Sequence, residues 1–231
     1  MNAQQASRPY RRRWALFNAL ALWAIAAVSA PSSAAAPLFV VALGDSLTAG
    51  YGLPPDQSFP VKLQAWLLAH GVEAELINAG LSGDTSAGGL ARLDWALADR
   101  HDAVLVELGA NDALRGIDPK ITYDNLDQIL TRLEAKKLKA MLLGMRAPAN
   151  WGPDYQRQFD AIYPDLAKKH GVPLYPFFLE GVALQADLIQ ADRIHPNAKG
   201  VDAVVGRVGP YVLHFLKPDA PNIGSARMGG G

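Results

Sequence analysis

Short apolar segments typical of strands alternate along this chain with longer segments of helical periodicity. The strand-like segments cover residues 38–43, 74–78, 103–108, 140–145 and 172–175. The segments with apolar side chains three or four positions apart cover residues 60–70, 86–98, 123–137, 155–169 and 196–216. Strands separated by helices of this length pair in parallel, and the crossover helices cover both faces of the sheet. The pattern therefore predicts an α/β fold, a three-layer α/β/α sandwich around a five-stranded parallel sheet.

Two prolines fall inside the predicted helices. Pro164 lies within 155–169 and Pro210 within 196–216. Proline removes one helical hydrogen bond and clashes with the preceding turn. We therefore expect Pro164 to kink or split its helix and Pro210 to bend the last one. Pro196 is expected to open that last helix as its first-turn residue.

The amino terminus has the plan of a secretory signal peptide. Four arginines precede an apolar run of 15 residues, Trp14 to Val28, and small residues follow as far as Ala36. This run is shorter than the ~20 residues that span a bilayer. We predict a signal peptide over 1–36 that is cleaved between Ala30 and Ala36, so that the protein is secreted. An uncleaved amino-terminal anchor is the alternative. The Pro- and Gly-rich segment 217–231 is predicted to be a disordered carboxyl-terminal tail.

Charge and cysteine content exclude several classes of partner. The chain has no Cys, so it forms neither disulfides nor thiolate metal sites. Residues 1–36 hold four Arg and no acid, and their removal leaves 18 basic against 22 acidic residues, a net charge of −4. A mildly acidic domain has no electrostatic reason to bind nucleic acid or an anionic bilayer. We expect a small-molecule substrate, no nucleic acid, no stable membrane insertion after signal cleavage, and a monomer.

Polar residues follow the predicted strands at the points where the strands end. The first strand runs into Gly44, Asp45 and Ser46, and the second and third run into the segments 78–84 and 107–112. The segment 192–196, Asp-Arg-Ile-His-Pro, precedes the last helix. In a parallel sheet these carboxyl ends share one edge, where ligands bind. The topology therefore brings a hydroxyl, a Gly-rich turn, a carboxamide and a carboxylate–imidazole pair to one rim.

Together these residue types are those of a nucleophilic hydrolase. A serine hydroxyl such as that of Ser46 becomes reactive when an imidazole takes its proton, and His195 can be that base with Asp192 as its orienting partner. The intermediate of acyl transfer carries a negative oxygen. The N–H groups of Ser46 and Gly80 and the side-chain amide of Asn111 are the predicted donors to it. For the Gly-Asp-Ser-Leu turn alone, the alternative is a helix start capped by Asp45 or Ser46.

Four blocks of the chain resemble those of the GDSL, or SGNH, serine hydrolases. The blocks are Gly44-Asp45-Ser46-Leu47, Gly80, Gly109-Ala-Asn111-Asp112 and Asp192-x-x-His195. The similarity extends over residues 38–216 and is greatest to the bacterial periplasmic thioesterase, lysophospholipase and arylesterase branch. It implies an SGNH hydrolase domain over 37–216 with a flavodoxin-like sheet, located in the periplasm. It also implies cofactor-free hydrolysis of arylesters, acyl-CoA and lysophospholipids through a Ser-His-Asp acyl-enzyme mechanism.

Two other functions remain open at this level. A carbohydrate or peptidoglycan O-acetyl esterase would use the same residues. A non-catalytic small-molecule-binding domain could share the fold, although the complete set of Ser, Gly, Asn, Asp and His argues against it.

Two loops on the rim are candidates for binding an acyl chain. Residues 113–119 directly follow the predicted oxyanion donor and offer Leu114 and Ile117 as apolar contacts, with Gly116 as a hinge. We hypothesise that this loop moves over bound acyl chains. In the second loop, Trp151 could line the acyl groove, and simple packing is the alternative.

The remaining polar residues have simpler interpretations. Asp45, Asp84 and Asp112 could hold a divalent cation, but we expect them to cap helices and bond the loops, so no metal and no cofactor are predicted. Glu107 stands in a buried strand, and we predict that it bonds to a neighbouring loop. The other histidines are expected to be surface residues: His70, His101, His170 and His214.

Overall fold

The computed structural model describes residues 36–219, so the predicted signal peptide and most of the predicted tail lie outside the described residues. A five-stranded sheet of order β2-β1-β3-β4-β5 forms the centre of the domain. All four strand pairs are parallel, which confirms the predicted sheet. The strands are β1 (Leu38–Gly44), β2 (Ala74–Gly80), β3 (Ala103–Glu107), β4 (Lys139–Leu143) and β5 (Leu174–Tyr175).

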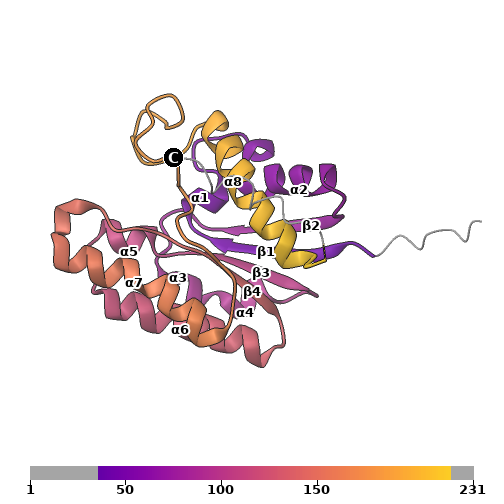
Figure 1. Cartoon of the computed structure of the whole chain (residues 1–231), viewed down its shortest axis with the longest axis horizontal. Helices are drawn as coiled ribbons and strands as arrows, with labels where there is room; N and C mark the ends of the chain where they lie inside the picture. Colours follow the sequence, from indigo (N-terminus) through magenta and orange to yellow (C-terminus); the bar gives the residue numbers. More distant parts are fainter. Residues whose placement is uncertain (1–35, 220–231) are drawn as a thin grey trace, which may run out of the picture. The chain divides into compact units, whose positions relative to one another are not determined.

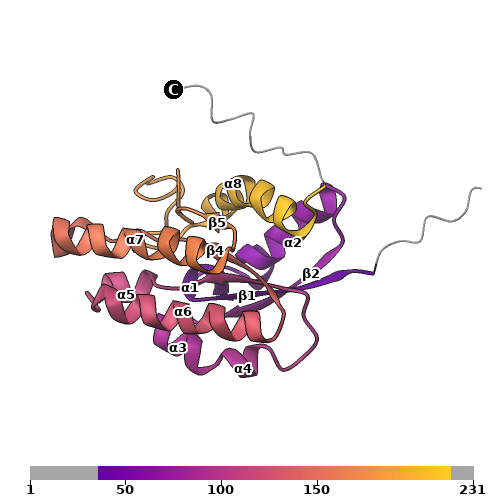
Figure 2. The same ribbon diagram turned by 60° about the horizontal axis from the view of Figure 1, so that its bottom comes forward.

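Helices cover both faces of this sheet, as the sequence predicts (Figure 1). One face carries α2 (Phe59–Ala69) and α8 (Ala198–Leu216). The other carries α3 (Ser86–Ala91), α4 (Leu93–Ala96), α6 (Pro119–Ala135) and α7 (Pro153–His170), as the turned view shows (Figure 2). Two short helices, α1 (Ser46–Ala49) and α5 (Ala110–Leu114), directly follow β1 and β3. Two 3-10 turns complete the fold, η1 (Pro55–Gln57) and η2 (Ala149–Trp151).

The two central strands are apolar along their length and bury every side chain from Val40 onward in β1 and throughout β3. Each fully buried Leu or Val contributes about 1.5–3 kcal/mol relative to an exposed one. In the register of the sheet, Gly44 lies opposite Gly80 on one side and Glu107 on the other. The ends of β1, β2 and β3 are therefore level, and this alignment positions the loops that follow them.

The last helix begins at Ala198 rather than at Pro196, which corrects the prediction. Pro196 is held instead in an antiparallel bridge with Ile189. The Asn197 side chain caps the helix by accepting a hydrogen bond from the Gly200 N–H at 3.0 Å. Asparagine is a strong N-cap residue, so the cap fixes the start two positions later than the proline rule suggests.

Neither internal proline ends its helix. The prediction that Pro164 could split its helix is wrong, because α7 runs from Pro153 to His170 through it. Buried residues stand on both sides of the proline, Phe159 and Ile162 before it and Leu166 after it. Their burial holds the helix together despite the lost hydrogen bond. Helix α8 likewise continues through Pro210.

The predicted helix over 86–98 is divided into α3 and α4 at Arg92. The Arg92 guanidinium is drawn to two groups near the end of β1. Its Nε donates to Asp84, and its Nη2 donates to the Gly44 carbonyl at 2.8 Å. These long-range contacts explain the break and have no signal in helical periodicity. Between residues 36 and 219, no helix combines the length and apolar character needed to cross a bilayer.

Candidate active site

Ser46 is the first residue of α1, on a tight turn at the end of β1. Asp45 is the N-cap, and its Oδ1 accepts a hydrogen bond from the Leu47 N–H at 2.9 Å. The turn also requires glycine before it, because a Cβ on Gly44 would lie 2.1 Å from the Thr48 hydroxyl oxygen. The cap considered from the sequence is therefore formed by Asp45. The hydroxyl of Ser46 takes no part in it.

Ser46, His195 and Asp192 form a continuous hydrogen-bonded chain, although 149 positions separate the first two. The His195 Nε2 lies 2.9 Å from the Ser46 Oγ, and its Nδ1 lies 2.6 Å from the Asp192 Oδ2. The second Asp192 oxygen accepts hydrogen bonds from the backbone N–H groups of Ile194 and His195, at 2.9 and 3.0 Å. The structure therefore brings together the three residues that the sequence nominated as catalytic.

The local bonds keep Asp192 ionised. Partial desolvation raises the pKa of this carboxyl, but the backbone hydrogen bonds from His195 and Ile194 and the imidazole contact outweigh it and lower the pKa to about 2. A charged Asp192 fixes the tautomer of His195, with its proton on Nδ1, and leaves Nε2 free to accept the hydroxyl proton.

Two residues that sequence reasoning missed hold His195 in place. The ring of Tyr51 lies against the imidazole, with centroids 4.5 Å apart. Gln190 donates from its backbone N–H to the His195 carbonyl at 2.8 Å. Its side-chain amide also donates to the carbonyls of Tyr51, at 2.7 Å, and Pro196, at 2.9 Å. Gln190 thus links Tyr51, in the turn after α1, to the segment that holds His195 and Pro196. No sequence motif indicates a glutamine in that role.

The predicted oxyanion donors differ in their surroundings. The Asn111 side chain comes from α5 and donates to the Asp45 Oδ2 at 3.2 Å, beside the nucleophile turn. Gly80, by contrast, donates its N–H to the Asn78 side chain at 3.0 Å, so this donor is already engaged. A Cβ on Gly80 would lie 2.3 Å from the Ala49 nitrogen. Glycine is needed at position 80 for close packing against α1.

Gly83 is a second glycine of the same loop. It adopts a left-handed conformation, with φ of 86°, and its carbonyl accepts a hydrogen bond from Arg115 at 2.9 Å. The Leu81 N–H donates to the Gly44 carbonyl at 3.1 Å, which holds the loop against the end of β1. Among residues 36–219, no hydrogen bond leaves the Gly83 N–H. Its backbone therefore has a donor to offer in the loop that Leu81 holds against the end of β1.

The other acids of the rim bond the loops to one another, as predicted. Asp112 accepts hydrogen bonds from the backbone and hydroxyl of Ser86 and from the Thr122 hydroxyl at 3.1 Å. Asp84 pairs with Arg92. Within the part of the chain that the structure describes, no cluster of three or more His, Cys, Asp or Glu side chains is suited to hold a metal ion.

The residues proposed for acyl binding lie at the end of α5, in the loop after it and in η2. The Trp151 indole N–H donates to the Ala113 carbonyl at 2.8 Å, and its ring packs on Gly116, where a Cβ would come within 2.8 Å of it. The Tyr155 hydroxyl donates to the Ile117 carbonyl at 2.8 Å. Leu114 and Trp151 remain 46% and 45% exposed, so they offer an apolar surface one turn beyond Asn111.

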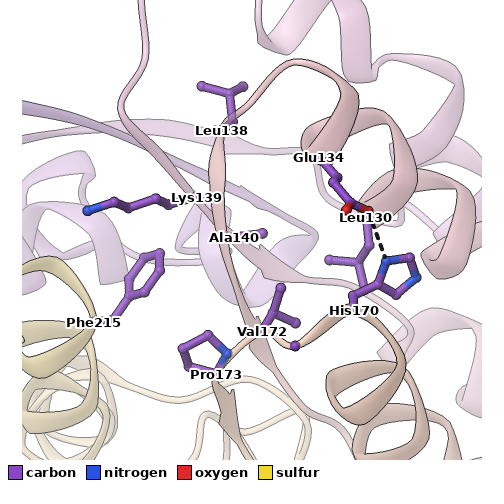
Figure 3. Close-up of a pocket in the computed structure, with 10 residues that line it drawn as sticks. Leu130, Glu134, Leu138, Lys139, Ala140, His170, Val172, Pro173 and Phe215 are labelled. Atoms are coloured by element: carbon purple, nitrogen blue, oxygen red, sulfur yellow. Dashed lines mark ion pairs between the residues drawn. The ribbon is translucent and has the colours of Figure 1, made fainter.

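Two hollows lie on different edges of the domain. One of about 520 Å³ is lined by residues of the loop that leads to His195: Leu184, Gln185, Ala186, Ile189, Gln190, Ala191 and Arg193. The other, of about 260 Å³, lies at the start of β4 and the approach to β5 (Figure 3). His170 lines this second hollow. It is half-buried, with Nε2 2.7 Å from Asp127, so the expectation of a surface histidine is wrong there.

Comparison with known proteins places this geometry in a family. The sequence model of the GDSL-like Lipase/Acylhydrolase family matches residues 42–203, which hold Ser46, Asn111, Asp192 and His195. The chain belongs to this family. The GDSL family assignment expected from the four blocks is therefore confirmed.

Similar members of the GDSL family bear the names of esterases. An arylesterase of Vibrio mimicus is 42% identical over 82% of this chain and 90% of its own length. The thioesterase 1/protease 1/lysophospholipase L1 of Escherichia coli K12 is 46% identical over 78% of this chain and 88% of its own length. The crystal structure of a psychrotrophic Pseudoalteromonas esterase, EstA, inhibited by monoethylphosphonate, is 34% identical with a TM-score of 0.73. The alignment covers 77% of this chain and 98% of that one.

Proposed function

We propose that this GDSL-family chain is a serine esterase and thioesterase that works through an acyl-enzyme. The observation that carries the proposal is the unbroken chain from the Ser46 Oγ through the imidazole of His195 to Asp192, at 2.9 and 2.6 Å. An orienting carboxylate, a base and a nucleophile in this order are the parts that acyl transfer requires. The names of the relatives support the same chemistry.

The first half-reaction forms the acyl-enzyme. The Ser46 oxygen attacks the carbonyl carbon while its proton moves to the His195 Nε2, and Asp192 stabilises the imidazolium. The tetrahedral intermediate then collapses. Its bond to the alcohol or thiol breaks, and His195 returns the proton to that leaving group. The hollow beside Gln190 and Arg193 adjoins the histidine loop and is where we place the leaving group.

The second half-reaction releases the acid. Water takes the place of the leaving group and gives a proton to His195 as its oxygen attacks the acyl carbon. The bond to the Ser46 oxygen breaks, and the imidazole returns the proton to Ser46. The product is a carboxylic acid, and the enzyme regains its starting protonation state.

For the oxyanion we propose the Ser46 N–H, the Asn111 side chain and the Gly83 N–H. Gly83 takes the role that the sequence gave to Gly80, because the Gly80 N–H is engaged by Asn78 while no bond from the Gly83 N–H is found among residues 36–219. Removing one such donor typically costs about 10²–10³ in kcat. A crystal structure of the Ser46 phosphonate adduct tests the choice. A phosphonyl oxygen about 3 Å from the Gly83 nitrogen supports it, and one at the Gly80 nitrogen contradicts it.

The proposed substrates are arylesters, acyl-CoA thioesters and lysophospholipids. Leu114 and Trp151 are exposed, and Ile117 lies three positions after Leu114 in the loop that follows Asn111 and α5; we place the acyl chain against these three residues. The preference among these substrates is measured as kcat/KM for p-nitrophenyl esters of increasing acyl length, acyl-CoAs and lysophospholipids. Higher kcat/KM for an acetylated sugar than for every long-chain substrate would instead assign an O-acetyl esterase.

The catalytic assignment is tested with Ser46→Ala. This variant should fold with the same circular dichroism and thermal transition as the parent protein, lose esterase turnover, and no longer react with a fluorophosphonate probe. Retained turnover in the variant contradicts the role of Ser46. A parent protein that binds esters but neither hydrolyses them nor reacts with the probe would be a non-catalytic binding domain.

We also propose export to the periplasm, with residues 1–36 as the signal peptide and 217–231 as a tail outside the domain. The support is the arginine-apolar-small residue pattern of the sequence. Amino-terminal sequencing of the protein from the periplasmic fraction should find a start between 31 and 37. Sedimentation of the same sample should give a monomer.

A further inference from the structure

Glu107, a residue outside the proposed triad and oxyanion donors, lies directly beneath the nucleophile turn. It ends β3 beside Gly44, and it is 1% exposed. Its Oε2 accepts a hydrogen bond from the Thr48 hydroxyl at 2.7 Å and a longer one from the Asp45 N–H at 3.4 Å. Asp45 and Thr48 stand on either side of Ser46. One carboxyl oxygen therefore holds both sides of the turn that presents the nucleophile.

A second buried acid, Asp45, belongs to the same assembly. It is fully buried, and its two oxygens accept hydrogen bonds from the Leu47 N–H at 2.9 Å and the Asn111 side chain at 3.2 Å. Asp45 therefore fixes the orientation of a proposed oxyanion donor. Glu107 supports that arrangement through its bond to the Asp45 N–H.

The hydrogen bonds indicate that Glu107 is neutral and that Asp45 carries the charge. The Glu107 Oε1 is buried without a hydrogen-bond partner in the described structure, while both Asp45 oxygens are partnered. An unpartnered oxygen costs far less in a neutral acid than in an anion. Burial, followed by the charge of Asp45, raises the pKa of Glu107 well above its ordinary value. Burial also raises the pKa of Asp45, to about 6.

The charged groups around the pair act on Asp45 in opposite directions, and none of them pairs with Glu107. Asp112 adds a second negative charge near Asp45, whereas His195 favours the charged form of Asp45. The Arg92 guanidinium is directed to Asp84 and the Gly44 carbonyl. Tyr163, from α7, donates its hydroxyl to the Leu108 carbonyl. Among residues 36–219, no Lys, Arg or His forms an ion pair with Glu107.

We propose that Glu107 is a positioning residue for acyl transfer. As a neutral acid it fixes the Ser46 turn through Thr48 and the Asp45 N–H, and it leaves Asp45 as the charge that orients Asn111. This inference rests on the proposed hydrolase function. It predicts that the reaction needs a hydrogen-bond acceptor at position 107 and does not need a negative charge there.

Two substitutions separate these requirements. Glu107→Gln keeps a carbonyl oxygen for both hydrogen bonds and has the shape of the neutral acid, so its kcat should stay within about threefold of the parent value. Glu107→Leu removes the acceptor, and its kcat should fall by at least about tenfold, with KM changed less than about threefold. Thr48→Val removes the same bond from the donor side and should lower kcat in the same direction.

Val106→Ala is the matched control. Val106 is the neighbouring buried residue of β3, 1% exposed, and its truncation lowers stability without touching the turn. Rates are measured well below each variant's thermal transition and normalised to the fraction labelled by a fluorophosphonate. If Glu107→Leu keeps the parent kcat and loses only stability, as Val106→Ala should, the positioning role is refuted.

A second result would also overturn the inference. If Glu107→Gln loses as much kcat as Glu107→Leu, the reaction needs the charge, and the neutral assignment is wrong. Failure of the proposed function itself looks different. In that case the parent protein neither hydrolyses esters nor reacts with the probe, whatever stands at position 107.

Discussion

Two side-chain hydrogen bonds from the segment 151–155 hold the end of α5 and the loop that follows it, and their removal should loosen this loop by a predictable factor. Trp151 donates to the Ala113 carbonyl and Tyr155 to the Ile117 carbonyl, each at 2.8 Å. A neutral hydrogen bond of this kind contributes about 1 kcal/mol net. Trp151→Phe and Tyr155→Phe each keep an aromatic ring while removing one donor. The double variant should therefore destabilise the closed loop by about 2 kcal/mol.

Hydrogen exchange reads this change directly. About 1 kcal/mol corresponds to a fivefold change in the population of open loop, and about 2 kcal/mol to a thirtyfold change. The reporter is the Ile117 N–H, which joins the loop to α5 by donating to the Asp112 carbonyl at 3.0 Å. Its exchange should be about five times faster in each single variant and about thirty times faster in the double variant. Amides of the central strands serve as the control and should not change.

The same measurement tests whether the loop responds to substrate. A long-chain phosphonate bound to Ser46 should slow exchange at Ile117 in the parent protein, because the loop closes over the acyl chain. Exchange that is equal in the parent protein and the double variant would refute the claim that the Trp151 and Tyr155 bonds hold the loop. Exchange that does not respond to the bound inhibitor would refute loop movement over the acyl chain.

Three further predictions concern the turn that holds Ser46 and the residues that contact it. Asp192→Asn should lower kcat by about 10⁴, because an amide permits the wrong tautomer of His195, and active-site titration should show the same number of reactive sites. The pKa of Asp45 is raised to about 6 in the folded protein, so its contribution to stability is full below about pH 4 and is lost as pH rises through 6. Between pH 4 and pH 8 the free energy of unfolding of the parent protein should therefore fall by about 2.5 kcal/mol relative to that of Asp45→Asn, as measured by urea unfolding. An equal difference between the two proteins at both pH values would contradict the raised pKa of Asp45. Gly44→Ala should cost about 1–3 kcal/mol and reduce kcat, because its methyl group would overlap the Thr48 hydroxyl; an unchanged melting temperature would show that the turn tolerates a Cβ.

The sheet and the three catalytic candidates could be predicted because both depend on patterns within short segments of the chain. Apolar strands alternating with helices determine a parallel sheet, and its carboxyl edge collects the residues that end each strand. Ser46 and His195 lie far apart in sequence, yet each stands in a short polar segment that can be recognised on its own. The parallel topology alone therefore predicted that they meet at one edge of the sheet, without any side-chain distance.

Features set by individual side-chain contacts were missed. The break at Arg92 depends on Asp84 and the Gly44 carbonyl, and helical periodicity contains no information about them. The engaged N–H of Gly80 depends on the rotamer of Asn78. Glu107 was expected to bond to a loop, and it does, but the sequence did not show that this loop presents the nucleophile.

The order of the site residues along the chain has a consequence for synthesis. The nucleophile turn and β1 leave the ribosome early, whereas the loop holding Asp192 and His195 emerges only just before α8, which ends at Leu216. For most of its synthesis the chain therefore has Ser46 without the imidazole of His195. The hydrogen-bonded chain from Ser46 to Asp192 should form only when nearly the whole domain has been made.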